Sequence, residues 1–170
     1  MASAYGTVKD HHGAITVSSE VQVGTTFTII LPVREEDVEV TKEPQLLEHG
    51  TGRILLVDDE KNMRITGKGI LQDLGYDVLL AEDGKRALEI FQEQDSIDLV
   101  LLDMIMPNMN GQDCFDELKK RDPGVRVILT SGFTREESID EMKERGLSGF
   151  IRKPFRSSEL SHMVNNVLKN

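Results

Sequence analysis

Short apolar runs alternate with longer amphipathic stretches from residue 53 to the end of the chain. Five runs have the length and apolar character of buried strands, at residues 53–57, 77–81, 97–102, 125–130 and 149–152. The third run is apolar almost throughout rather than at every second position. Such continuous apolarity is typical of a strand covered on both faces, as in a parallel sheet.

Helical periodicity fills the intervals, at about residues 62–74, from 84, at 112–121 and 135–145, and from 157. Five strands alternating with five helices predict an α/β fold. The simplest topology is a flavodoxin-like (βα)5 doubly wound parallel sheet with strand order 2-1-3-4-5. In that order a crevice opens at the carboxyl ends of the first and third strands, where we expect the functional site.

The first 52 residues have a different pattern. Residues 34–52 contain six acidic side chains and one proline and few apolar residues, so they are expected to form a solvated linker. Residues 1–33 contain two strand-like runs, 14–17 and 25–33, that predict a short N-terminal β-hairpin without a core of its own. The predicted segments are therefore 1–33, 34–52 and 53–170.

Three carboxylates fall at strand ends that this topology makes neighbours: Asp58 and Asp59 after the first strand, Asp103 after the third. Acidic residues also end strands simply as turn formers and helix caps, and for one of them alone that explanation is preferred. Three such charges in one crevice would repel by roughly 4 kcal/mol per pair at about 4 Å. A hard cation would relieve this repulsion, and oxygen-only ligands favour Mg²⁺.

Thr130 ends the fourth strand and Lys153 follows the fifth, so both should approach the same crevice. Taken separately, Thr130 is an ordinary strand residue and Lys153 an ordinary surface charge. A hydroxyl and an ammonium beside a metal–carboxylate cluster suit an anion with several oxygens, such as a phosphoryl group. Asp103 would attack phosphorus in line while Lys153 neutralises one phosphoryl oxygen.

Four motifs in combination resemble the receiver domain of two-component response regulators. They are Leu56–Glu60, Asp98–Pro107 with Asn110 and Gly111, Val127–Ser131, and Lys153–Phe155. The resemblance covers residues 53–170. It implies that Asp103 accepts a phosphoryl group from a phosphohistidine-bearing kinase or phosphotransfer domain.

The same resemblance implies a ligand set for Mg²⁺. Asp59, Asp103 and the main-chain carbonyl of Ile105 would hold the ion, and Asp58 would help through water. Lys153 would bind a phosphoryl oxygen.

The resemblance also implies a switch. The Thr130 hydroxyl would be drawn toward the phosphoryl group, and Phe150 stands where the family has a rotating aromatic. A plain core aromatic is the alternative for Phe150. A cis peptide is expected between Lys153 and Pro154, since a cis bond before proline costs little.

Three pieces of the N-terminal stretch, Ala4–Gly6, His12–Val17 and Gly24–Pro32, resemble the C-terminal end of a histidine-kinase ATP-binding domain. The family's glycine-rich phosphate loop and its phosphorylatable-histidine helix are missing, so this stretch is not expected to bind ATP. The order suggests a fragment of a hybrid sensor histidine kinase. Whether the fragment is an enzyme in its own right is left open.

The formal charge of −10 disfavours nucleic acid and anionic membrane as direct partners. No signal peptide and no run of about 18 apolar residues is present, and the single cysteine, Cys114, fits a reducing compartment. These features suggest a cytoplasmic location, with a parent kinase that could be anchored in a membrane. The oligomeric state is left open.

Two other functions use similar residues. A phosphatase of the haloacid-dehalogenase type also forms an aspartyl phosphate, but it needs a second aspartate two residues after the first, where this chain has Ile105. A protein-binding module whose site no longer turns over is the other alternative, and the full acidic set argues against it. Flavin binding needs a Ser/Thr loop after the first strand, where this chain has acids.

Overall fold

The computed structural model describes residues 5, 7–9, 12–21, 23–32, 47–94, 96–132 and 136–169. The chain divides into two compact units, Met1–Glu43 and Pro44–Asn170. Each unit is described by itself below.

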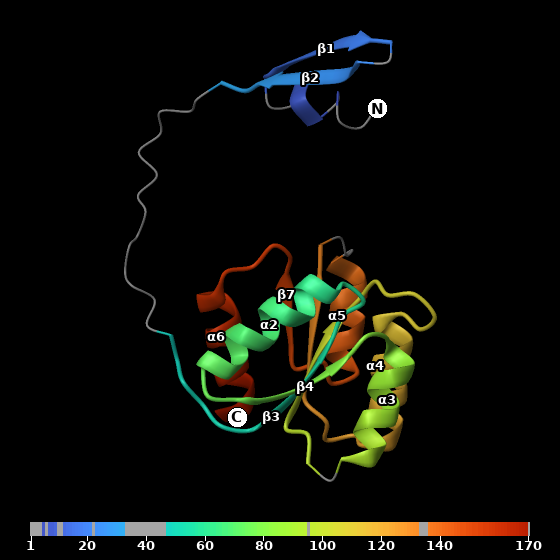
Figure 1. Ribbon diagram of the computed structural model, residues 1–170. Coiled ribbons are helices and arrows are strands. Elements are labelled where there is room, and N and C mark those ends of the chain that lie inside the picture. The colour runs from blue at the N-terminus through green and yellow to red at the C-terminus, as the bar shows by residue number, and fades with distance from the viewer. Residues whose placement is uncertain are drawn as a thin grey trace. The chain divides into compact units, whose positions relative to one another are not determined.

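The first unit contains a two-stranded antiparallel hairpin (Figure 1). Strand β1, Ala14–Glu20, pairs with β2, Gly24–Ile30, with Ala14 opposite Ile30 and Glu20 opposite Gly24. All strand residues except the half-buried Ile15 are exposed. An isolated pair of strands is marginally stable in water, because it buries little apolar surface.

The second unit is built on a five-stranded parallel sheet. Its strands are β3 (Arg53–Val57), β4 (Asp77–Ala81), β5 (Leu99–Asp103), β6 (Val127–Ser131) and β7 (Gly149–Arg152). They lie in the order β4-β3-β5-β6-β7, which reads 2-1-3-4-5 when numbered within this sheet. Every residue of β5 and β6 is buried, as expected of strands covered on both faces. The prediction of a parallel α/β sheet is confirmed.

Five helices cover the sheet. They are α2 (Lys61–Asp73), α3 (Gly84–Glu93), α4 (Gly111–Arg121), α5 (Glu136–Glu144) and α6 (Ser157–Lys169). Helices α2 and α6 lie on one face and α3, α4 and α5 on the other, so each face has its own buried apolar cluster (Figure 1). Among the described residues, no helix has both the length and the hydropathy needed to cross a bilayer.

Local chemistry explains where several elements begin. The Asp83 side chain accepts a hydrogen bond from the Arg86 amide at 2.8 Å and caps α3, and Asn110 caps α4 in the same way. Strand β5 begins at Leu99 rather than at residue 97, and the Asp98 carboxylate just before it accepts a hydrogen bond from the Arg53 amide at 2.7 Å. The predicted cis peptide between Lys153 and Pro154 is present.

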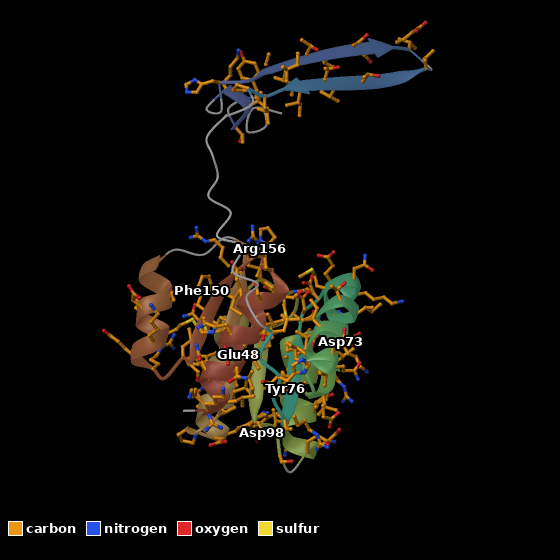
Figure 2. The ribbon with its side chains drawn as sticks, turned by 90° about the vertical axis from the view of Figure 1, so that its left-hand side faces the viewer. Glu48, Asp73, Tyr76, Asp98, Phe150 and Arg156 are labelled. Carbon is orange, nitrogen blue, oxygen red and sulfur yellow. The ribbon has the colours of Figure 1, made fainter. Side chains whose placement is uncertain are left out.

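The expected linker at 34–52 differs from the structure in its last part. Residues 34–46 lie outside the described part of the chain, and residues 48–50 are not a free linker. The Glu48 amide donates to the Ser161 hydroxyl of α6 at 2.7 Å, and the Asn165 amide donates to the His49 carbonyl at 3.3 Å. The sequence pattern missed this docking, because it depends on polar side chains of a helix more than 100 residues away. Glu48 and Tyr76 are labelled in Figure 2.

Candidate active site

Three carboxylates meet at the carboxyl edge of the sheet. Asp58 and Asp59 directly follow β3, and Asp103 ends β5, the parallel neighbour of β3. One carboxylate oxygen from each residue lies within 4.8 Å of those from the other two. In Figure 2, Arg156 follows β7 and marks this edge, whereas Asp98 precedes β5 and marks the opposite one. The structure therefore brings together the three acids that the sequence placed at strand ends.

Lys153 binds two of these carboxylates. Its Nζ atom lies 2.6 Å from Asp58 Oδ2 and 2.9 Å from Asp103 Oδ2. Its main-chain amide donates to the Ser131 carbonyl at 2.8 Å, which continues the pairing of β6 and β7 to the lysine itself. The ammonium is thus held inside the acidic cluster and does not point to bulk solvent.

Burial and the neighbouring charges shift the pKa values of both Asp103 and Lys153. Burial raises the pKa of Asp103; the hydrogen bond from Lys153 opposes this, and the nearby Asp58 adds to it. Burial alone would lower the pKa of Lys153, but its hydrogen bonds to Asp58 and Asp103 outweigh burial and hold that pKa above its usual value. Burial thus disfavours the ionised form of Asp103 despite the contact with Lys153, and a bound cation would favour that form.

The two adjacent acids after β3 have different environments. Asp58 is buried, and both its oxygens are occupied, Oδ1 by the Glu60 amide at 2.9 Å and Oδ2 by Lys153. Asp59 is exposed, and among the described residues no donor contacts its carboxylate. Asp59 is therefore the acid most open to direct contact with a cation, and Asp103 lies beside it. Carboxylate oxygens are the donors that Mg²⁺ prefers, so the residues present fit this ion.

The other three predicted site residues, Thr130, Ile105 and Phe150, have different surroundings. Thr130 is buried, pairs with Asp103 across β5 and β6, and lines a cavity of about 230 Å³ together with Lys153. The Ile105 amide donates a hydrogen bond to the Asp103 carboxylate, whereas the Ile105 side chain is 62% exposed. Phe150, labelled in Figure 2, is half-buried against the apolar cluster under α3, α4 and α5. It lines a pocket of about 360 Å³ with Lys153.

Sequence reasoning missed Arg64. Its Nη1 atom donates to the main-chain carbonyl of Asp58 at 2.6 Å and to that of Asp59 at 2.8 Å. The sequence feature that could have indicated it is a long basic side chain in the first turn of the helix that follows the acidic residues after β3.

Residues 54–165 match the family described as response regulator receiver domain. The chain belongs to this family. The chemotaxis protein CheY of Thermotoga maritima is 36% identical over 118 residues, which cover 69% of this chain and 98% of CheY. Receiver domains bind Mg²⁺ at an acidic cluster of this kind.

Solved structures of receiver domains agree with this family assignment. A response regulator receiver domain protein from Clostridium thermocellum has a TM-score of 0.65 at 36% identity, over 69% of this chain and 94% of that one. A chain of the CheX–CheY–BeF3–Mg²⁺ complex from Borrelia burgdorferi has a TM-score of 0.66 at 28% identity, over 68% of this chain and 88% of that one.

One relative extends over the first unit as well. The sensor kinase CckA of Brucella abortus is 34% identical over 180 residues, which cover 99% of this chain. The chain spans only 19% of the length of that kinase.

Proposed function

We propose that this chain is the receiver portion of a hybrid sensor histidine kinase and accepts a phosphoryl group from a phosphohistidine onto Asp103. The observation that carries the proposal is the juxtaposition of three carboxylates within 4.8 Å with Lys153 Nζ bonded to two of them. An acidic cluster alone would attract a cation. The added ammonium and the Thr130 hydroxyl provide partners for an anion as well.

In the transfer, a carboxylate oxygen of Asp103 attacks phosphorus. The new O–P bond forms as the P–N bond of the phosphohistidine breaks, and the bonding electron pair stays on the imidazole nitrogen. Lys153 exchanges its contact with Asp103 for one with a phosphoryl oxygen. The Thr130 hydroxyl donates to another phosphoryl oxygen, and Phe150, the proposed switch aromatic, moves with it.

Mg²⁺, when bound, neutralises negative charge shared between the carboxylates and the phosphoryl oxygens. Asp59, Asp103 and the main-chain carbonyl of Ile105 would hold it directly. Asp58 would act through water; it is more deeply buried than Asp59, and the Glu60 amide and Lys153 already bind its carboxylate.

The alignment with CckA over nearly the whole chain supports the hybrid-kinase context. Residues 1–33 would then be the last part of the kinase ATP-binding domain, 34–52 the linker and 53–170 the receiver. The partner would be a phosphohistidine on the kinase itself or on a phosphotransfer domain, in the cytoplasm.

Beryllofluoride, a mimic of the phosphoryl group, tests the proposal. The wild-type protein should bind it only when Mg²⁺ is present, and Asp103→Ala should abolish binding. Asp73→Ala, which removes an exposed carboxylate from the far end of α2, is the matched control and should bind as the wild type does. Mg²⁺-independent binding, or binding retained by Asp103→Ala, would contradict the proposal. Repeated turnover of a phosphate monoester would instead favour the phosphatase alternative.

A further inference from the structure

The turn between β3 and α2 supplies two of the three carboxylates, and Lys153 and the Ala81 carbonyl hold its first residue, Asp58. Glu60, at the N-cap of α2, makes no side-chain capping hydrogen bond. The turn is held from inside by the Glu60 amide, which donates to Asp58 Oδ1 at 2.9 Å. From outside it is held by Arg64, whose Nη1 atom contacts the carbonyls of both Asp58 and Asp59.

We propose that Arg64 is a positioning residue that fixes the Asp59 carboxylate for cation binding. Asp59 is exposed, and no donor among the described residues contacts its carboxylate, so its direction depends on its main chain. Arg64 holds the carbonyl of that residue together with the preceding one. Because one nitrogen atom joins both carbonyls, the contact restricts rotation of the peptide units that carry the two acids.

The inference rests on the proposed function, since it concerns the same cation site. Groups that orient metal ligands without touching the metal change metal affinity by about 10-fold or more when they are removed. Hydrogen bonds from a charged guanidinium are stronger than neutral ones, so Arg64 can hold a partly exposed turn.

If Arg64 acted only through its positive charge, the expected change in Mg²⁺ affinity on its removal would be the opposite. The chain carries a formal charge of −10, and deleting a cation near three carboxylates would strengthen their attraction for a divalent ion. If Arg64 acted only through its charge, its removal would leave Mg²⁺ affinity unchanged or raise it. If Arg64 positions Asp59, its removal lowers that affinity.

The test is titration of the full chain with Mg²⁺ by calorimetry. Arg64→Met should weaken Mg²⁺ binding by about 10-fold, and Arg64→Lys, which keeps a cationic donor, should recover most of the loss. Lys68→Met, on the next turn of α2, removes the same charge from a residue without these carbonyl contacts and should bind Mg²⁺ as tightly as the wild type or more so. Should Arg64→Met fail to fold, Arg64→Gln takes its place with the same expected direction.

Amide hydrogen exchange of the metal-free protein gives a second readout. Residues 59–61 should exchange faster in Arg64→Met than in the wild type or Lys68→Met. Unchanged exchange with Mg²⁺ affinity at or above the wild-type value would overturn the positioning role while leaving the proposed function intact. A wild-type protein that binds no Mg²⁺ would remove the proposed function, and the positioning role with it.

Discussion

Asp103 carries a charge that the metal-free fold does not favour. Burial, the largest influence, holds the pKa of Asp103 above its ordinary value despite the contact with Lys153. A raised pKa means that the folded protein retains this proton more tightly than the unfolded chain does. The contribution of Asp103 to stability is therefore highest below the ordinary carboxyl pKa of about 3.9 and falls as pH rises through the higher folded value.

Replacing Asp103 with Asn should therefore raise the free energy of unfolding at neutral pH without metal, because the buried charge is removed. With excess Mg²⁺ the order should reverse, because the ion stabilises the wild type by binding its folded form. Thermal unfolding with chelator and with Mg²⁺ measures both effects. The difference between the two proteins should shrink toward acidic pH, and a difference that is constant with pH would refute the assignment to this carboxyl group.

Helix α2 contains two glycines with different surroundings. A Cβ atom added at Gly69 would meet no atom within 4 Å, whereas one added at buried Gly67 would lie 2.9 Å from Leu56 Cδ2. Gly69→Ala should therefore stabilise the protein by about 0.5–1 kcal/mol through helix propensity alone. Gly67→Ala should stabilise the protein less or not at all, because the Leu56 side chain must move within a packed core. Urea unfolding of the two variants compares their free energies of unfolding directly. Equal increases would show that the Leu56 side chain can move aside at no cost.

Apolar pattern was sufficient to predict the elements, since strands 53–57, 77–81 and 149–152 have the predicted bounds. The meeting of the acids also followed from the pattern, because neighbouring parallel strands end at one edge of the sheet. The difference between Asp58 and Asp59 did not follow from it. The two residues are chemically identical and adjacent, and only Lys153 and Glu60 in three dimensions show which one has its oxygens occupied.

At the scale of the whole molecule, residues 48–50 belong with the receiver unit. Ser161 and Asn165 are almost fully buried on α6, and both form hydrogen bonds with this segment. Gly50 also donates its amide to the Leu74 carbonyl at 2.9 Å. The compact unit that includes these residues begins at Pro44 rather than at Arg53, where its first strand begins.

Two truncations test this boundary. A protein of residues 44–170 should keep the full unfolding free energy of the receiver unit, because its apolar clusters and the α6 contacts remain. A protein of residues 53–170 should be less stable by about 1–3 kcal/mol, because buried polar groups of Ser161 and Asn165 lose their partners. Chemical denaturation of both proteins measures the difference. In a Ser161→Ala background the truncation to residues 53–170 should lower the free energy of unfolding by less, because one of those polar groups is already gone. An equal loss in both backgrounds would mean that residues 48–50 do not stabilise the unit through Ser161.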